Sequence, residues 1–362
     1  MKVLAEDSTA GGPEAEAILS VHAATCQQPA YFEIGTEPSG RSFLCAPGET
    51  ILKAGLAAGL AISYECASGS CGTCRARLLE GEVENHWPDA PGLSARDRAK
   101  GDRILCCQAM PKTACRIQVA HNTSTVTPAP RRWVAVLAER IDLKRNVLRL
   151  SLQVDAPCDF LAGQFMMFQL PGVGRRAYSM SNRPDGSGRL DFIVKAKPGG
   201  CATALLFSGL AEGDALMLEG PYGHAHWRDS GERTVVGLAG GSGLGPVWSV
   251  LQAALHSGTR QPVHLFFGVN EADDLFLTEE FKALAAHFPQ LQVQRVLMRA
   301  GASDPADCVI GTLSEVALRC LGDLNKCDVY MAGPPAMIDA ALKDTVMVGR
   351  ACADRVYFDR FC

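Results

Sequence analysis

The sequence predicts a three-domain chain, with a small α+β domain first, an antiparallel β-barrel second and a parallel α/β domain last. Its 362 residues are enough for two or three separate cores. A polar, proline-containing stretch at residues 121–130 reads as a linker. After Gly231 many short β-type runs give way to alternating strands and helices. The predicted parts are a mobile tail at 1–29, domains at 30–122, 132–230 and 231–362, and a linker at 123–131.

Composition narrows the classes of protein. A hydrophobic content of 47%, a charged content of 20% and a net charge of -4 predict a globular protein and argue against nucleic-acid binding. The N-terminus lacks the apolar core of a secretory signal, which predicts a cytoplasmic protein. The uncharged run Val235–Leu255 holds several glycines and a proline, so we expect no membrane span there. The 15 cysteines therefore indicate metal ligands and buried thiols.

The expected elements follow the hydrophobic periodicity within each domain. In the first domain, a helix at Ile51–Ala61, capped by Glu49-Thr50, is flanked by strands at Tyr31–Ile34, Arg75–Leu79 and Cys115–Val119. The barrel strands are predicted at Val134–Leu137, Asn146–Val154, Gln164–Leu170, Arg189–Lys195 and Ala215–Glu219. In the last domain, strands at Thr234–Leu238, Val263–Val269 and Gln292–Leu297 alternate with helices at Val247–His256 and Glu279–His287.

Three cysteines carry the most specific signal. Cys66, Cys71 and Cys74 have the C-x4-C-x2-C spacing of a plant-type [2Fe–2S] site, which needs a fourth thiolate from a distant segment. Zinc sites instead favour paired C-x2-C knuckles. Cys106 and Cys107 are both candidates for the fourth ligand, and in an extended segment only one of two neighbours can face the cluster.

A glycine-rich loop opens the last domain. It contains Gly240, Gly241, Gly243, Gly245 and Pro246, and it follows a β-run and precedes a helix. That context is required of a loop whose backbone N–H groups hold a nucleotide pyrophosphate. The sequence therefore predicts a dinucleotide site at residues 238–246.

The stretches Tyr64–Cys74 and Trp87–Arg98 resemble a known family. The chain resembles the reductase components of bacterial multicomponent oxygenases, especially those of toluene and alkene diiron monooxygenases, over residues 30–362. The resemblance implies a β-grasp [2Fe–2S] ferredoxin domain, a six-stranded antiparallel flavin barrel and a Rossmann-like nucleotide domain. It also implies that Cys107, which precedes Gln108-Ala109, is the fourth cluster ligand rather than Cys106.

The same resemblance assigns a flavin site. The family motif R-x-Y-S reads Arg176-Ala-Tyr178-Ser179 here. It implies that Arg176 neutralises the flavin pyrophosphate, Tyr178 lies against the isoalloxazine and Ser179 donates near the nitrogen that accepts hydride. The loop chemistry would serve FMN as well, and the resemblance favours FAD. The implied phosphate loop contributes Lys195, Gly199, Gly200 and Thr203.

Two further segments match the nicotinamide side of the family. Gly333 and Pro334 belong to Ala332-Gly-Pro-Pro-Ala-Met337, in which many relatives have Cys at the position of Ala332. The C-terminus resembles an aromatic-acid ending, so that Phe361 is a candidate neighbour of the flavin ring and a candidate catalytic residue beside Ser179. The alternative is a core strand with Tyr357 and Phe358 packed at its end.

The family implies a hydride step from NADH to FAD, followed by single-electron transfer through the cluster. The expected acceptor is an oxygenase hydroxylase component or its ferredoxin, most simply of a diiron monooxygenase. A Rieske aromatic-ring oxygenase is the alternative acceptor, and a non-catalytic iron–sulfur redox sensor is the rival from another class. We expect a monomer with no membrane partner.

Acidic residues favour NADH over NADPH. Glu271, Asp273 and Asp274 follow the strand Val263–Val269, where the adenosine ribose is expected. An acid there accepts hydrogen bonds from a ribose 2′-hydroxyl and repels a 2′-phosphate. Arg299 is the contrary observation, because it follows the next strand and can approach the same ribose.

Overall fold

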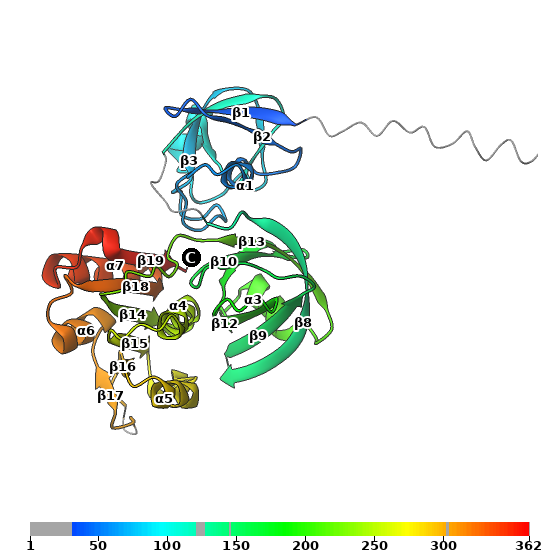
Figure 1. Cartoon of the computed structure of the whole chain (residues 1–362). Helices are drawn as coiled ribbons and strands as arrows, with labels where there is room; N and C mark the ends of the chain where they lie inside the picture. The colour runs from blue at the N-terminus through cyan, green and yellow to red at the C-terminus, as the bar shows by residue number, and fades with distance from the viewer. Residues whose placement is uncertain (1–30, 121–126, 145, 302–303, 362) are drawn as a thin grey trace, which may run out of the picture.

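The computed structural model describes residues 31–120, 127–144, 146–301 and 304–361. The predicted tail at 1–29 and part of the predicted linker lie outside these residues. Figure 1 shows three domains: the N-terminal domain at the top, the barrel at the right and the C-terminal domain at the left. The last strand points to the centre, where the three domains meet (Figure 1). The predicted fold class is confirmed in all three parts.

The N-terminal domain is a five-stranded sheet in the order β2-β1-β7-β3-β5. Strand β1 is parallel to β7, while β1–β2, β3–β7 and β3–β5 are antiparallel, which is the β-grasp arrangement. The strands are β1 Phe32–Glu37, β2 Ser42–Cys45, β3 Arg75–Glu80, β5 Arg103–Leu105 and β7 Cys115–Val119. A two-stranded ribbon pairs β4 (Val83–Asn85) with β6 (Ala109–Pro111).

The helix of this domain is shorter than predicted. It runs over α1 Ile51–Ala57, where Ala61 was the expected end, and Thr50 caps it by accepting the Lys53 N–H. The helix stops because Gly59 turns the chain at φ +72° and the Leu60 amide returns to the Gly55 carbonyl. A second short helix, α2 (Ala95–Lys100), was not predicted. Ser94 and Asp97 form its capping box.

The barrel has six antiparallel strands in the order β11-β10-β13-β8-β9-β12. A bridge between Met180 and Phe192 joins the two ends of this order and closes the barrel. The strands are β8 Arg131–Lys144, β9 Val147–Val154, β10 Phe165–Leu170, β11 Gly174–Ser179, β12 Arg189–Lys195 and β13 Ala215–Tyr222. Strand β8 extends beyond the predicted Val134–Leu137 at both ends, and its burial alternates most clearly where Ala135 and Leu137 point inward. Helix α3 spans Cys201–Ser208.

The C-terminal domain is a six-stranded, fully parallel sheet in the order β17-β16-β15-β14-β18-β19. Its strands are β14 Thr234–Gly240, β15 Val263–Val269, β16 Leu291–Leu297, β17 Cys308–Ile310, β18 Cys327–Gly333 and β19 Val356–Arg360. Short helical turns occupy Gly241–Gly243, Ala272–Asp274, Asp344–Val348 and Ala353–Arg355.

Helices cover both faces of this sheet. Helices α4 (Leu244–His256) and α5 (Thr278–His287) pack on one face, and α6 (Leu313–Leu321) and α7 (Pro335–Lys343) pack on the other. The chain order reverses between β14 and β18, so the carboxyl ends of these two strands flank the crevice in which such sheets bind ligands.

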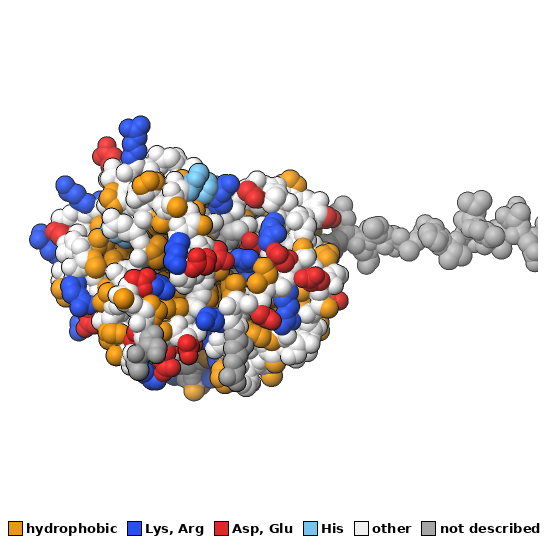
Figure 2. Space-filling model, turned by 90° about the horizontal axis from the view of Figure 1, so that it is seen from below, with side chains coloured by type: hydrophobic (Ala, Val, Ile, Leu, Met, Phe, Trp, Pro, Cys, Tyr) orange, Lys and Arg blue, Asp and Glu red, His pale blue; other side chains and the backbone are white. Residues whose placement is uncertain are grey.

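Apolar contacts join the domains. Phe165, Met167 and Tyr222 of the barrel share one core with the N-terminal domain, and Val147 and Ile193 share another with the C-terminal domain. Lys, Arg, Asp and Glu side chains are interspersed over the face seen in Figure 2. Within the described residues, no helix is both long enough and apolar enough to cross a bilayer.

Candidate redox centres

The four predicted cluster cysteines lie together as two pairs. The Sγ atoms of Cys74 and Cys107 are 3.3 Å apart, and the Cys71 backbone N–H donates to the Cys66 Sγ at 3.4 Å. Among the described residues, no group of three or more His, Cys, Asp and Glu side chains is arranged for a single metal ion. Two pairs of thiols suit a cluster of two irons, each of which needs two protein ligands. The donor set therefore fits a [2Fe–2S] group.

Hydrogen bonds make one thiol of each pair the more acidic. The Cys71 thiol lowers the pKa of Cys66 to about 6, and the Cys74 thiol lowers the pKa of Cys107. The pKa values of Cys71 and Cys74 are raised by the same hydrogen bonds and by burial. The backbone N–H groups of Ser68 and Thr73 also donate to the Sγ atoms of Cys66 and Cys71, respectively, each at 3.4 Å. Donors of this kind stabilise thiolates, which is the form that binds iron.

Cys107 is the neighbour that reaches Cys74, while Cys106 is buried elsewhere. Cys106 is fully buried, and its backbone N–H donates to the Cys74 carbonyl at 3.0 Å. The two cysteines lie in a turn, not in the extended segment that the sequence analysis assumed. The buried Gln108 side chain donates to the Cys107 Sγ at 3.5 Å, a contact that no sequence signal predicted.

The segment Trp87–Arg98 packs on the cluster loop. A Cβ at Gly72 (φ +80°) would lie 2.6 Å from the Gly92 carbonyl oxygen, and the Gly92 N–H donates to the Gly69 carbonyl at 2.8 Å. The Arg98 guanidinium donates to the Leu93 carbonyl at 2.6 Å. In the sequence analysis this segment only supported the family resemblance. In the structure it packs against the loop that carries the thiols and holds the backbone of that loop in place.

Two adjacent arginines of β11 have different environments. Arg175 pairs with Glu219, a nearly fully buried carboxylate that also accepts from the Tyr222 hydroxyl at 2.7 Å. Arg176 is exposed, and its guanidinium donates to the Arg175 carbonyl at 2.8 Å. Arg176 is therefore open to a phosphate, whereas Arg175 stabilises the barrel.

Tyr178 and Ser179 occupy the end of the same strand. The Tyr178 ring packs on Phe168 with centroids 4.7 Å apart, and burial raises the pKa of its hydroxyl to about 12. Ser179 is half-buried and is the last residue of β11. Its neighbour in space is Gly245, since a Cβ there would lie 3.7 Å from the Ser179 carbonyl oxygen.

The proposed phosphate loop connects β12 to α3. Lys195 ends β12, Gly199 has φ +70° and Gly200 is the N-cap of α3. Thr203 ties the loop, because its hydroxyl accepts the Lys197 N–H and donates to the Gly200 carbonyl, both at 3.1 Å. The Thr203 hydroxyl thus shapes the loop, and among the described residues no side chain caps the first amides of α3, which leaves them available to an anion.

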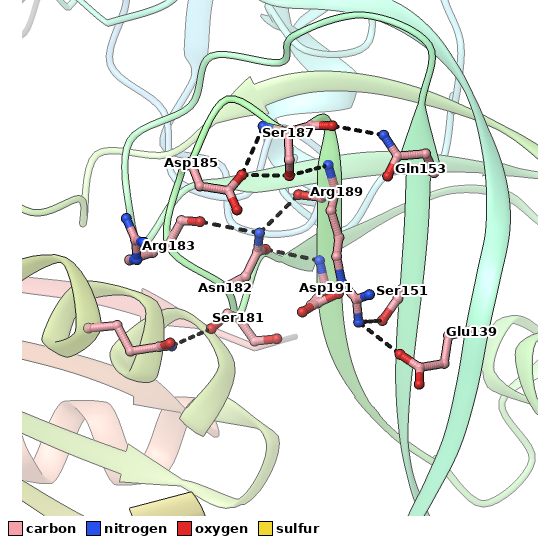
Figure 3. Close-up of polar contacts among 11 residues, drawn as sticks. Glu139, Ser151, Gln153, Ser181, Asn182, Arg183, Asp185, Ser187, Arg189 and Asp191 are labelled. Atoms are coloured by element: carbon pink, nitrogen blue, oxygen red, sulfur yellow. Dashed lines mark hydrogen bonds and ion pairs between the residues drawn. The ribbon is translucent and has the colours of Figure 1, made fainter. Parts of the chain in front are cut away.

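The loop after Ser179 is anchored by Asn182 (Figure 3). Its amide accepts the Asp191 N–H and donates to the Arg189 carbonyl, both at 2.9 Å. The Arg189 guanidinium in turn reaches Glu139 and the Ser151 hydroxyl, each at 2.8 Å (Figure 3). These contacts fix the backbone that follows the flavin motif.

The glycines of the nucleotide loop have separate tasks. A Cβ at Gly243 would lie 2.1 Å from the Ala332 carbonyl oxygen, so this glycine permits β18 to approach the loop. Gly240 and Gly333 both pack on the Met337 side chain. Gly241 has φ +56°, and no atom of the described residues lies within 4 Å of the place that a Cβ would take there. The open edge of the loop is therefore at Gly241, in the crevice between β14 and β18.

The C-terminal strand brings Phe361 beside this crevice. The Phe361 N–H donates to the Gly333 carbonyl at 2.9 Å, at the carboxyl end of β18. Tyr357 stacks on Tyr330 at 4.9 Å. The packing expected of Tyr357 is thus present. Phe361 lies beside the predicted nicotinamide motif, because it is hydrogen-bonded to Gly333, which precedes Pro334 in that motif.

Comparisons with known proteins agree with this geometry. Three family models match: a 2Fe-2S iron-sulfur cluster binding domain at residues 34–112, an oxidoreductase FAD-binding domain at 134–227 and an oxidoreductase NAD-binding domain at 238–343. The ferredoxin–NAD(+) reductase component of the alkene monooxygenase system of Xanthobacter autotrophicus is 45% identical, over 89% of this chain and 98% of its own. The chain belongs to the reductase components of oxygenase systems.

Other relatives of the reductase cover nearly all of its length. The ferredoxin–NAD(P)(+) reductase CarAd of Metapseudomonas resinovorans is 35% identical over 88% of this chain and 96% of its own. A solved ferredoxin reductase in carbazole 1,9a-dioxygenase matches with a TM-score of 0.82 and 32% identity, over 92% of this chain and 99% of that one. The family confirms an NAD(P)H-dependent oxidoreductase with a [2Fe–2S] cluster, FAD and NADH as cofactors.

In the reductase, a buried contact links the cluster domain to the barrel. The Gly223 N–H donates to the Tyr64 hydroxyl at 2.9 Å, and the Tyr64 ring lies 4.4 Å from the His224 ring. Tyr64 is 4% exposed and precedes the first cluster ligand by two residues. Burial and nearby Arg228 lower the pKa of His224 to about 4, so the ring is neutral. No sequence signal indicated this contact.

Glu271 and Arg299, which favour opposite nucleotide preferences, form an ion pair with each other. The Arg299 guanidinium lies 3.4 Å from the Glu271 carboxylate, and both side chains are exposed. The Arg299 N–H also donates to the Asn270 carbonyl at 3.1 Å. Both predicted ribose contacts therefore lie at the carboxyl ends of β15 and β16.

Proposed function

We propose that the chain transfers electrons from NADH, through FAD and the [2Fe–2S] cluster, to the hydroxylase of a diiron alkene or aromatic monooxygenase or to its ferredoxin. The observation that carries this proposal is the junction of Tyr64 with Gly223. It links the segment before the first predicted cluster thiol to Gly223, the residue that directly follows barrel strand β13. Within one chain, the cluster and the flavin pocket thus share a buried contact.

The proposed ligand sets combine the family resemblance with the positions of these residues in the fold. The cluster ligands are Cys66, Cys71, Cys74 and Cys107. The FAD contacts are Arg176, Tyr178, Ser179, Lys195, Gly199, Gly200 and Thr203, with Phe361 at the ring. The nucleotide contacts are Gly240, Gly241, Gly243, Gly245, Pro246, Glu271, Gly333 and Pro334. When bound, FAD accepts a hydride and gives up electrons singly, and the cluster carries single electrons.

The residues of the chain prepare the site for those groups. Arg176 offers an exposed guanidinium to the pyrophosphate. Ser179 carries its hydroxyl on the last residue of β11, whose carbonyl lies beside Gly245 at the start of the nucleotide helix. Apolar side chains of the barrel pack on both other domains and hold the three predicted sites in one unit. No protein nucleophile takes part.

The partner class is tested by reconstitution. The Xanthobacter relative serves an alkene monooxygenase system, whereas another relative, 30% identical, belongs to the naphthalene 1,2-dioxygenase system of Pseudomonas putida. We expect NADH-dependent product formation with a diiron hydroxylase and its accessory components. Turnover only with a Rieske oxygenase system would favour the alternative partner.

A redox sensor is separated from an enzyme by a simple assay. We expect NADH to reduce cytochrome c catalytically through the purified protein. A protein that is reduced once and does not turn over would support the sensor.

We propose that the enzyme acts as a monomer in the cytoplasm, because one chain holds every predicted centre and its 13 described free cysteines suit a reducing compartment. Sedimentation at the mass of one chain tests the first statement.

Nucleotide preference is tested at the exposed pair. We expect NADH to exceed NADPH in kcat/KM, and Arg299→Ala to widen the ratio by several-fold, because the base that could hold a 2′-phosphate is removed. Glu271→Gln should narrow the ratio. An NADPH preference in the unaltered protein would show that Arg299 dominates the ribose pocket.

A further inference from the structure

We propose that Ser249 and Gln252 of helix α4 are positioning residues for the hydride step. They fasten the nucleotide domain to the backbone that directly follows the flavin motif. The proposal rests on the proposed function, since it takes residues 176–179 and 240–246 as the flavin and nucleotide sites. It concerns side chains that touch neither cofactor.

Two hydrogen bonds cross the domain boundary at this point. The Ser249 hydroxyl donates to the Asn182 carbonyl at 2.6 Å, and the Gln252 amide donates to the Ser181 carbonyl at 3.0 Å. Figure 3 labels the two acceptor residues, Ser181 and Asn182. Ser249 is fully buried, so its hydroxyl is a costly group unless it has a partner. Among the described residues, the only hydrogen-bond partner of the Ser249 hydroxyl is the Asn182 carbonyl, which lies in the other domain.

The contacts form one face of the helix. Gly245, Ser249 and Gln252 are spaced at i, i+4 and i+7, which places them on the same side of α4. A Cβ at Gly245 would lie 3.7 Å from both the Ser179 carbonyl oxygen and the Ser181 Cβ. The first turns of α4 therefore run along residues 179–182 of the barrel.

Both ends of this link are rigid. On the barrel side, the Ser181 N–H donates to the Asp191 carbonyl at 2.7 Å, and the Asn182 side chain is held by Asp191 and Arg189. On the other side, α4 follows the turn Gly241–Gly243 without a break. A fixed path thus joins the nucleotide loop to Ser179.

The consequence is geometric. Hydride transfer is sensitive to the relative placement of donor and acceptor, and a displacement of about 1 Å can lower a rate by as much as 100-fold. Besides the core that the two domains share, the barrel and the C-terminal domain each have a separate core, so loss of the two bonds should leave both domains folded. The apolar contacts of Val147 and Ile193 would still join the domains, but α4 would no longer be hydrogen-bonded to residues 181 and 182, and the nucleotide loop would shift relative to the flavin strand.

The test uses the full-length holoprotein with the double variant Ser249→Ala and Gln252→Glu. The first change removes the hydroxyl, and the second replaces an amide donor with an acceptor of the same shape. The matched control is Ser257→Ala with Gln290→Glu, because these side chains donate to carbonyls within their own domain, at 2.8 and 3.2 Å. FAD and iron contents are measured first.

Two readouts are compared. Hydrogen–deuterium exchange should rise in peptides that cover residues 179–183 in the test variant and not in the control. Anaerobic single-turnover mixing with NADH should show a limiting rate of flavin reduction lowered on the order of tenfold, with a weaker charge-transfer band between nicotinamide and flavin. FAD and cluster contents should match the unaltered protein.

Specific outcomes overturn the proposal. Unchanged exchange with an unchanged limiting rate would show that the bonds do not set the geometry. Loss of FAD in the test variant alone would make them supports of flavin binding instead. If NADH does not reduce the flavin of the unaltered protein, the proposed function itself fails, and this result is distinguishable because it does not involve the variants.

Discussion

The cluster loop and the nucleotide loop both depend on glycines, yet they use them in opposite ways. At Gly72 the place of a Cβ is filled by the Gly92 carbonyl, whereas at Gly241 it is open. The cluster loop is closed by its own domain, through Gly92 and Arg98. The nucleotide loop leaves its open edge for a ligand, and its placement depends on a second domain through Ser249. The metal site is thus local, and the hydride site is assembled between domains.

The largest effect is expected at the fourth cluster ligand. Cys107→Ser should abolish the visible spectrum and the electron paramagnetic resonance signal of the cluster, because the Cys74 pair is lost. NADH–ferricyanide activity should remain, since it needs only the flavin. Cys106→Ala is the matched control and should keep the cluster. A cluster retained in Cys107→Ser and lost in Cys106→Ala would reassign the ligand.

The two loops are compared directly by Gly72→Ala and Gly241→Ala. Both residues have positive φ, which costs an alanine about 1–2 kcal/mol, but only Gly72 adds a collision with the Gly92 carbonyl. We expect Gly72→Ala to lose the cluster and Gly241→Ala to raise the KM for NADH with the cluster intact. Gly48→Ala, with φ +72° and open space, is the control in the first domain. Similar cluster contents in all three variants would contradict the packing argument.

The adjacent arginines separate ligand binding from stability. Arg176→Ala should yield protein depleted of FAD with a full cluster, because Arg176 is exposed for the pyrophosphate. Arg175→Ala should instead lower the free energy of unfolding by about 1–3 kcal/mol, because Glu219 loses a buried partner. FAD content and thermal unfolding are measured for both. Full flavin occupancy in Arg176→Ala would make that residue a surface charge only.

The smallest effect is a pH dependence at Asp359. Burial and the nearby Glu65 raise its pKa to about 7, and its Oδ2 atom is buried with no hydrogen-bond partner among the described residues. The folded state therefore holds a proton that the unfolded state releases near pH 4, and the contribution of this group to stability falls as pH rises from about 4 to about 7. Asp359→Asn should raise the unfolding temperature more at about pH 8 than at about pH 5. An equal change at both values would contradict the shift.

Local sequence patterns predicted those features of the fold and of the sites that are determined by residues close together in the chain. The spacing of Cys66, Cys71 and Cys74 and the order of the glycine loop follow from chemistry within a few residues, and the domain order follows from changes in periodicity. The contacts of Tyr64 with Gly223, of Gln108 with Cys107 and of Ser249 with Asn182 join distant segments. No local sequence pattern indicates which distant residue a tyrosine, glutamine or serine side chain will contact. Short elements such as α2 were missed because a capping box without an apolar stripe gives little periodicity.

The central claim is that electrons reach the cluster only through the flavin pocket. Anaerobic rapid mixing with NADH, which follows flavin and cluster absorbance separately, tests it most directly in the unaltered protein and in Arg176→Ala freed of FAD. The account predicts that flavin bleaching precedes cluster reduction in the first, and that the cluster of the second stays oxidised until FAD is added back. Reduction of the cluster by NADH at the same rate without flavin would contradict it.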